Sequence, residues 1–149
     1  MWASGYGVGP NAIRFVVRLT GGPHDGEIVC ASTLGDLDEE REHAHIGWTG
    51  YDPRVWATQV NPETKLLMLG LAFSRGYGRV KLQADDRNDR SRGAMLKLGA
   101  TFEGIVRRDM RRADGSWRDS AVYSILVDEW PAVRAGLEAR LARYGDRPV

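Results

Sequence analysis

The hydrophobic pattern at the start of the chain predicts a β-hairpin. Residues Ile13–Leu19 (IRFVVRL) are rich in β-branched side chains, and Glu27–Thr33 (EIVCAST) follows a glycine- and proline-containing turn at 21–26. Two such runs joined by a turn are typical of antiparallel partners. The next segment, Asp36–Glu42, contains a single apolar side chain, and we expect an acidic loop there.

A third strand is predicted at His43–Thr49 (HAHIGWT), where apolar and polar positions alternate. One face of this strand carries Ala44, Ile46 and Trp48. The opposite face carries His43, His45, Gly47 and Thr49.

The clearest helix signal lies in the middle of the chain. Asn61 is a favourable N-cap residue, Pro62 suits the first helical position, and Glu63 suits the positive end of a helix. The segment 76–78 (GYG) ends this helix, and Arg79–Asp85 (RVKLQAD) alternates as a strand. Strand, helix and strand at this spacing predict a parallel pair joined by a crossover helix.

The last third of the chain predicts a helix, a hairpin and a terminal helix. The helix covers Asp89–Leu98, and the hairpin strands Thr101–Arg111 and Ser116–Val127 meet at an Asp-Gly turn. Trp130 and the following proline open the terminal helix. The order β-β-β-α-β-α-β-β-α has no repeat and no linker. It predicts one α/β domain over residues 1–149, of which 1–12 form a flexible lead-in.

Composition narrows the class of protein. A chain of 149 residues with 42% hydrophobic and 28% charged residues fits one globular core. Cys30 is the only cysteine, which excludes an internal disulfide and favours a reducing, cytoplasmic location. Three histidines without zinc-type spacing predict no metal site.

The candidate ligand-binding groups lie at the starts of two predicted helices, both of which are polar. The loop within Tyr51–Lys65 enters a helix and directs unpaired N–H groups and the positive helix end at one point, which suits a phosphate. Residues 85–92 (DDRNDRSR) do the same after the next parallel strand, so both starts meet at one sheet edge. Asn88 and Ser91 have capping spacing there. Each start, taken alone, is equally well explained as ordinary helix capping.

Four segments in continuous order carry a family resemblance. They are IGWT, then DPRVW with VNPETKLLML, then RVKLQADDRNDRSRGAMLKLGATFEG, and then RRDMRRADGSWRDSAVYSILVDEWP. Residues 43–130, which hold these segments, resemble RimJ/RimL-type acetyltransferases of the GNAT (GCN5-related N-acetyltransferase) superfamily. The resemblance implies a mixed β-sheet with flanking helices. It also implies transfer of an acetyl group from acetyl-CoA, within a ternary complex, to the amine of a protein N terminus or a small molecule.

The resemblance also implies where the coenzyme binds. In this family the first loop holds the pyrophosphate of coenzyme A, and the Asn-x-x-Ser helix start contacts the pantetheine arm and its sulfur. The strands on either side of the first helix splay apart around that arm. The implied coenzyme-binding residues are Trp48, Trp56, Ala57, Thr58, Gln59, Val60, Asn61, Asn88, Ser91 and Arg92.

Two features depart from the family pattern. The pyrophosphate loop usually reads Arg/Gln-x-x-Gly-x-Gly/Ala, whereas Ala57 and Gln59 occupy the two small positions here. Gln59 needs either a negative φ or some strain at this position, and its side chain would crowd the phosphates, so we expect weaker coenzyme binding. Family members also have a strand and two helices before the strand that matches Ile13–Leu19, where this chain has about twelve residues. We therefore expect a truncated chain or a completing partner subunit, and a homodimer that covers the exposed apolar surface.

Acetyl transfer needs a base for the amine, donors for the oxyanion and help for the leaving thiolate. Backbone N–H groups of the splayed strands are the candidate oxyanion donors, and Ser91 is the candidate donor to the thiolate. His43 and His45 share the strand face that should border the thioester. His45 is nearer the splayed end and is the candidate base. The alternative is a structural His45 with a chain of water molecules as the base.

The sequence leaves two alternatives for the role of several arginines and one alternative function for the protein. Arg90 and Arg92 are either phosphate ligands or solvated side chains. The run 107–112 (RRDMRR) is either a solvated strand edge or a contact for an acidic protein or the 3′-phosphate of the coenzyme. The rival function is a degenerate acyl-CoA-binding protein without turnover. A net charge of only +1 and the lack of a recognition motif disfavour nucleic-acid binding.

Overall fold

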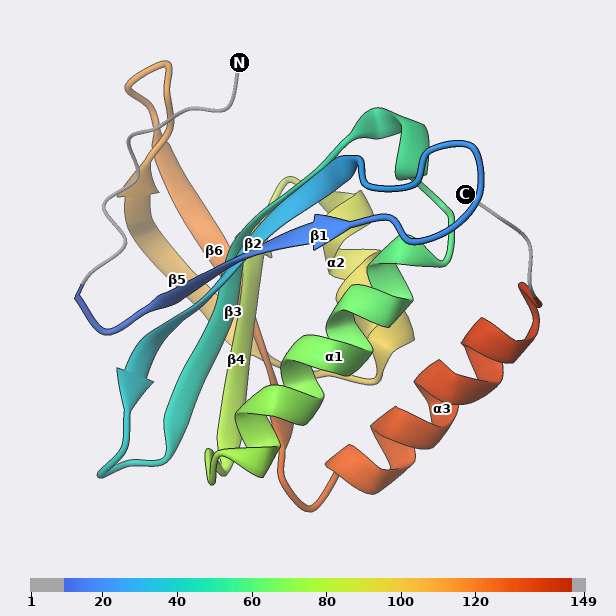
Figure 1. The fold of residues 1–149 in the computed structure, drawn as a ribbon. Helices are drawn as coiled ribbons and strands as arrows, with labels where there is room; N and C mark the ends of the chain where they lie inside the picture. Colours follow the sequence, from blue (N-terminus) through green and yellow to red (C-terminus); the bar gives the residue numbers. More distant parts are fainter. Residues whose placement is uncertain (1–9, 146–149) are drawn as a thin grey trace.

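The computed structural model describes residues 10–145, which form one mixed β-sheet with helices against one face (Figure 1). The strands are β1 (Ile13–Arg18), β2 (Ile28–Asp38), β3 (His43–Tyr51), β4 (Arg79–Asp85), β5 (Thr101–Arg111) and β6 (Trp117–Leu126). The helices are α1 (Val60–Ser74), α2 (Asp89–Leu98) and α3 (Trp130–Ala142), with a 3-10 turn, η1, at Pro53–Val55. The predicted order and α/β class are confirmed. Residues 1–9, most of the predicted lead-in, lie outside the described residues.

The strand order β1-β2-β3-β4-β6-β5 contains a single parallel pair, β3 with β4. Their pairing covers three positions and ends where His45 lies opposite Lys81. Both strands continue past that point, β3 to Tyr51 and β4 to Asp85. They therefore diverge toward their carboxyl ends, where η1, α1 and α2 begin.

β2 is longer than the sequence predicts. The expected acidic loop at Asp36–Glu42 is wrong in its first half, because the strand continues to Asp38. Leu34 is fully buried on this strand, and Gly35 pairs with His45 of β3, so tertiary pairing extends the strand into acidic sequence. As a result β2 carries Asp36 alongside β3.

α1 begins earlier than the sequence predicts. The N-cap position is Gln59, and the assignment of Asn61 as the cap is wrong. The Thr58 hydroxyl accepts from the Val60 N–H at 3.3 Å, and the Glu63 N–H donates to the Gln59 carbonyl at 3.0 Å, which closes the first turn sooner. The Asn61 side chain is thereby released to accept a hydrogen bond from the Tyr51 hydroxyl at 2.9 Å.

α2 begins and ends as predicted. The Asn88 side chain caps it by accepting from the Ser91 N–H at 3.0 Å. Gly99 ends it in the left-handed conformation, with φ of 95°, where glycine carries no steric penalty.

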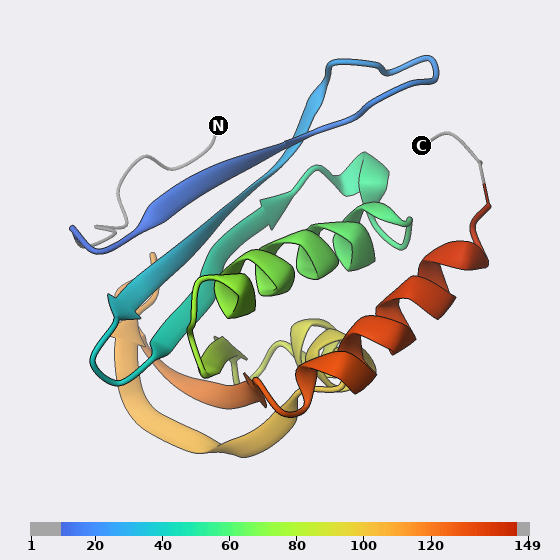
Figure 2. The same cartoon turned by 60° about the horizontal axis from the view of Figure 1, so that its bottom comes forward.

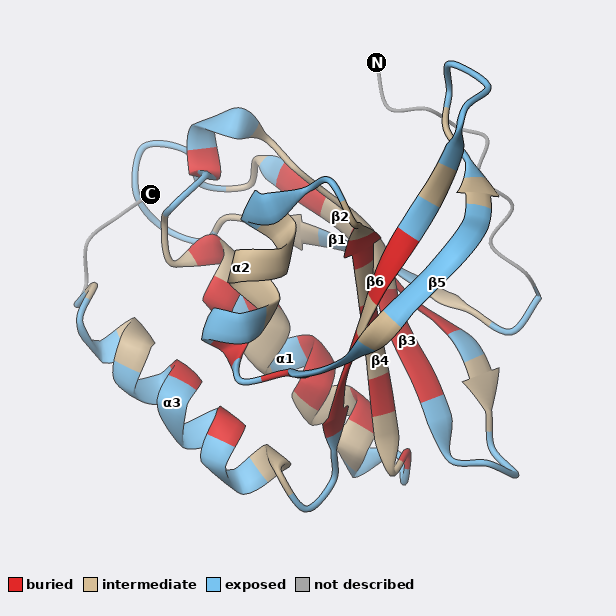
Figure 3. Ribbon diagram, turned by 180° about the vertical axis from the view of Figure 1, so that it is seen from behind, coloured by how far each residue is buried: buried red, intermediate tan, exposed pale blue. Residues whose placement is uncertain are grey.

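The core lies between the sheet and the helices, all three of which cover one side of the curved sheet (Figure 2). Apolar positions of the central strands and of α1 are fully buried there, among them Leu34, Ile46, Leu69, Val80, Leu82 and Ile125. β6 is buried along its middle, whereas β5 is mostly exposed (Figure 3). Several polar side chains of the strands are also buried, among them Thr33, His45, Ser120 and Ser124. Within the described residues, none of the helices is both long and apolar enough to span a membrane.

Candidate active site

The divergence of β3 and β4 opens a cavity of about 560 Å³ on the helix side of the sheet. Its walls come from β3 residues Ile46–Tyr51, from η1 and the start of α1, and from β4 and α2. Of the predicted coenzyme-binding residues, six line it: Trp48, Trp56, Ala57, Asn61, Asn88 and Ser91. The structure thus brings the two predicted helix starts together in one cleft.

The loop before α1 carries its backbone strain at Ala57. This alanine has φ of 63°, in the left-handed region that disfavours side chains, whereas Gln59 has φ of −67°. The expectation of strain at Gln59 is therefore wrong. The chain turns at Ala57, so Gln59 enters the helix with ordinary geometry.

Four of the predicted coenzyme-binding side chains lie outside this cleft. Gln59 and Val60 line a different cavity, and Thr58 lines neither, with its hydroxyl donating to the Val55 carbonyl at 2.7 Å. Arg92 is held by Asp86 at 2.9 Å and by the Tyr123 hydroxyl at 3.3 Å.

Two other arginines line the cleft instead of Arg92. The guanidinium of Arg90 lies 4.0 Å from the ring centroid of Trp56, at the exposed mouth of the cleft. Arg140 reaches the cleft from α3, a contribution that sequence reasoning missed because α3 is distant along the chain. The two guanidinium groups give this mouth a positive charge that suits phosphates.

Lys65 is a further residue that sequence reasoning missed. It lies one helical turn after Asn61, so both side chains project from α1 into the cleft. Burial lowers the pKa of its amine to about 8, and no carboxylate among the described residues pairs with it. The i, i+4 spacing from Asn61 was the available sequence signal. A cation that loses solvent in this way stabilises an anion or an acceptor atom placed beside it.

His45, the predicted base, faces the opposite side of the sheet. Its ring is 3% exposed, and Nδ1 lies 2.9 Å from Asp36 Oδ2. Nε2 is buried and has no hydrogen-bond partner within residues 10–145. Burial, with the nearby positive charge of Lys81, lowers the pKa of His45 to about 4, although Asp36 opposes that shift. The imidazole is therefore neutral near pH 7, with Nδ1–H donating to Asp36 and Nε2 as the unprotonated nitrogen.

His45 lines a second cavity, of about 370 Å³, together with residues of β4 and of the β5–β6 hairpin. Gly47 and Gln83 line both this cavity and the first one. A side chain at Gly47 would place Cβ 2.7 Å from His45 Nε2, so glycine is required for the imidazole to pack against β3 at this point. The two cavities therefore meet at the divergence of β3 and β4.

Trp48 lies at this junction and does not follow the alternation of apolar and polar side chains predicted for β3. Its φ of 50° marks an irregular strand position, and its ring centroid lies 4.9 Å from that of His45. The prediction that Trp48 shares a face with Ala44 and Ile46 is wrong. The local turn of the backbone rotates Trp48 to line both cavities.

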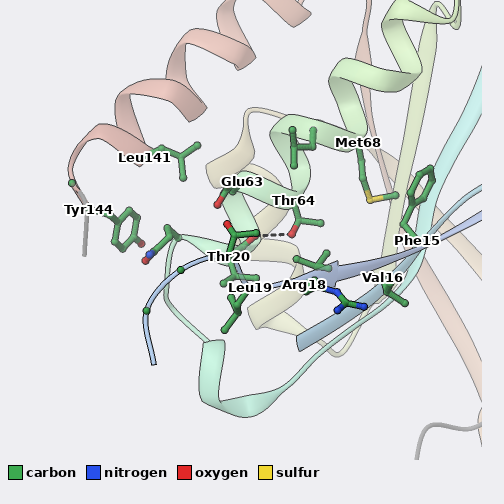
Figure 4. Close-up of a pocket in the computed structure, with 17 residues that line it drawn as sticks. Phe15, Val16, Arg18, Leu19, Thr20, Glu63, Thr64, Met68, Leu141 and Tyr144 are labelled. Carbon is green, nitrogen blue, oxygen red and sulfur yellow. Dashed lines mark hydrogen bonds between the residues drawn. The ribbon is translucent and has the colours of Figure 1, made fainter. Parts of the chain in front are cut away.

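A third cavity, of about 810 Å³, is separate from this junction (Figure 4). It lies between β1, the outer side of α1 and the end of α3, where Leu141 and Tyr144 close it. No residue lines both this cavity and the first one. Thr64 on its wall is satisfied locally, since its hydroxyl donates to the Val60 carbonyl at 2.7 Å. Within residues 10–145, no group of three or more His, Cys, Asp or Glu side chains is placed to hold a metal ion.

Solved acetyltransferases share this fold. A T. thermophilus protein assigned as an acetyltransferase is 34% identical, with a TM-score of 0.80 over 89% of this chain and 68% of that one. A GCN5-related N-acetyltransferase from Brucella melitensis is 30% identical, with a TM-score of 0.74 over 78% of this chain and 52% of that one. Mycobacterium smegmatis RimJ, solved with CoA-disulfide, is 23% identical, with a TM-score of 0.75 over 87% of this chain and 60% of that one, a likeness of fold alone. No protein-family model and no curated protein matches the sequence.

The sequence identity and the diverging strand pair lead to one assignment. The identity to the T. thermophilus protein extends over most of both chains. The chain belongs to the GCN5-related N-acetyltransferase (GNAT) superfamily and is an N-acetyltransferase.

Proposed function

We propose that this enzyme, of the RimJ/RimL type, transfers the acetyl group of acetyl-CoA directly to a primary amine within a ternary complex. The observation that carries the proposal is the junction of two cavities at Gly47, Trp48 and Gln83. A coenzyme arm in the first cavity would present its thioester where an amine arrives from the second. Direct transfer needs this arrangement, because both substrates must be bound together.

The first cavity supplies groups for each part of the coenzyme. The loop N–H groups near Ala57 and the positive end of α1 suit the pyrophosphate, and Arg90 with Arg140 adds positive charge. Ser91 lies at the start of α2, where its hydroxyl suits the leaving thiolate. The RimJ structure with CoA-disulfide supports a coenzyme A ligand for this fold.

The proposed reaction proceeds by attack of a neutral amine on the thioester carbonyl carbon. The C–N bond forms, the C–S bond breaks, and the coenzyme leaves as a thiolate that takes up a proton. The amine loses its proton to His45 Nε2, which is neutral and has no competing partner. Backbone N–H groups of β3 beyond its pairing with β4 are the proposed oxyanion donors.

Binding and kinetics test the proposal separately. Acetyl-CoA at a hundredfold excess over its dissociation constant should stabilise the fold by roughly 2.7 kcal/mol, measured as a rise in Tm. Steady-state rates with a panel of amines should give intersecting double-reciprocal lines, as a ternary complex requires. Parallel lines would indicate an acetyl-enzyme and refute direct transfer. Binding without turnover of any amine would select the rival, a degenerate acyl-CoA-binding protein.

We also propose that the chain forms a homodimer. Val16 of β1 is 61% exposed, Ile28 of β2 is 54% exposed and Leu67 of α1 is 66% exposed. Val16 and Leu67 line the outer cavity, so this apolar surface is continuous with a groove that a second copy would cover. Light scattering at micromolar concentration should report a dimer, and a well-folded monomer would refute it.

A further inference from the structure

The second cavity has a reactive end and a basic end. His45, Gly47, Trp48 and Gln83 line it where it meets the coenzyme cleft. At the other end, the β5–β6 hairpin contributes its lining residues Met110, Arg111, Arg112, Ala113 and Arg118, beside Asp85 of β4. An acceptor whose amine reaches His45 therefore extends its remaining groups toward three arginines.

These arginines outnumber the acidic groups that line the cavity. Asp85 is the only carboxylate among the described residues that line the cavity, and Arg112 binds it at 2.6 and 2.9 Å. That contact lowers the pKa of Asp85 to about 2, so the carboxylate is charged and already neutralised by its partner. Asp114 and Asp119 of the same hairpin accept from the backbone N–H groups of Ser116 and Arg108, outside the cavity.

Arg111 and Arg118 form no ion pair with a carboxylate among the described residues, although the charge of Arg118 helps to lower the pKa of Asp85. Arg118 Nε donates to the Ser120 hydroxyl at 3.0 Å, and Arg111 Nη1 donates to the Gly115 carbonyl at 2.7 Å. The Arg111 guanidinium also lies 4.4 Å from the ring centroid of Trp117. Neutral partners and an aromatic ring orient both guanidinium groups and leave two positive charges at this end of the cavity.

The distance between the two ends fixes where an anionic group would lie on the acceptor. Lys81 is the register partner of His45, and Asp85 is four residues farther along β4 and pairs with Ser120. At about 3.3 Å per residue, the basic end is roughly 13 Å from the level of His45 and about 7 Å from Gln83. The α-carboxylate of a free amino acid is too close to its own amine to span that separation. An extended peptide spans it in two to four residues.

We infer that the preferred acceptor is the N terminus of a peptide or protein with acidic side chains at its second to fourth positions, bound by Arg111 and Arg118. This inference rests on the proposed function and names the substrate class of the same site. It assigns the arginine run of the β5–β6 hairpin to acceptor selection. Arg107, which belongs to the same run, does not line the cavity.

The test compares matched peptides on the full-length enzyme. Peptides with Asp or Glu at positions two to four should have a kcat/KM at least about tenfold above that of their Asn or Gln counterparts, and the ratio should fall as salt rises. Arg118→Gln combined with Arg111→Gln should reduce the ratio toward one. Arg118→Lys keeps the positive charge and should therefore retain most of the preference for acidic peptides. Arg107→Gln, which removes one positive charge from an exposed residue of the same hairpin outside the cavity, should leave the ratio unchanged.

Each contrary result has a distinct meaning. Equal rates for acidic and neutral peptides, or a preference that survives the double variant, would overturn the inference while leaving acetyl transfer intact. Free aspartate acetylated as well as the acidic peptides would overturn the assigned spacing and indicate a small anionic amine. Calorimetry of acidic peptides with the CoA-bound enzyme gives a readout that does not depend on turnover, and equal affinity for acidic and neutral peptides would also overturn the inference. Turnover of no amine at all would refute the proposed function itself.

Discussion

Asp36 Oδ2 lies 2.9 Å from His45 Nδ1, and this contact orients the only buried imidazole among the described residues. Asp36 is on β2 and His45 is on β3, so the contact depends on the register in which Gly35 pairs with His45. Lys81 Nζ is 3.3 Å from the same carboxylate oxygen. The result is a neutral histidine whose Nε2 faces Gly47 at the junction of the two cavities.

Replacing His45 tests its role as the base. His45→Gln should lower turnover by roughly a hundredfold at pH 7, with a smaller loss at higher pH because more of the amine is already neutral. The wild-type rate should show no inflection between pH 6 and 7 from this residue, since the pKa of His45 is about 4. Rates measured from pH 6 to 9 check both points. His43→Gln, at an exposed position of the same strand, is the control. Wild-type turnover and pH profile in His45→Gln would identify water as the base.

Asp36 is predicted to act through His45. In Asp36→Asn, the new amide can donate to Nδ1, which would move the imidazole proton to Nε2 and block proton acceptance. We expect turnover to fall by at least about tenfold while the KM for acetyl-CoA stays unchanged. Nitrogen NMR of the imidazole should report the changed tautomer. Asp38→Asn, on the same strand, is the control. An unchanged tautomer with normal turnover would contradict a positioning role.

His45 should also make the stability of the protein depend on pH. Its pKa is about 4 in the folded state, below its ordinary value of 6.5, so the unfolded chain binds more protons between these values. The free energy of unfolding should therefore fall as pH drops from 6.5 to 4, by up to about 3 kcal/mol, and level off below. The pKa of Asp36 is also lowered, so its protonation reduces the free energy of unfolding further at the lowest pH values. Urea denaturation between pH 4 and 6.5 should show that the free energy of unfolding of His45→Gln depends less on pH than that of the wild type. An equal dependence in both proteins would assign it to other groups.

The loop before α1 offers a stabilising substitution. Ala57→Gly should raise the free energy of unfolding by up to about 1 kcal/mol, because glycine relieves the left-handed strain at φ of 63°. Gln59→Gly should instead destabilise the protein by about 0.5–1 kcal/mol, because Gln59 has ordinary helical geometry. Thermal denaturation of the two variants gives the comparison. Stabilisation by Gln59→Gly alone would place the strain at that residue instead.

Lys65 should couple coenzyme binding to pH. Its pKa of about 8 means that the positive charge is lost as pH rises from 7 to 9, so the affinity for acetyl-CoA should decline over that range. Lys65→Met should bind more weakly at pH 7 and lose this pH dependence. Calorimetry in buffers of different ionisation heat would also detect proton uptake on binding to the wild type. Lys97→Met, at an exposed position of α2, is the control. Equal pH dependence in Lys65→Met would exclude a role for this amine.

The sequence by itself determined the elements whose signals are local. β4, α2 and β5 occupy the predicted residues, because strict alternation, an Asn cap and a terminal Gly act within a few positions. The short parallel pairing of β3 and β4 also follows the family resemblance. The bounds of β4, α2 and β5 depend on neighbours in the chain, so they can be recognised in the sequence.

Only the tertiary structure decided the geometry of the site. Pairing with β3 extends β2 into acidic sequence and brings Asp36 next to His45. The sequence of the turn between the two strands does not indicate this contact. The rotation of Trp48 at φ of 50° joins the two cavities, although the alternating sequence placed this side chain on the other face. Arg118 lines the second cavity from β6, far along the chain from His45. Strand register and backbone irregularities are set by packing between distant segments, and for that reason no local pattern reveals them.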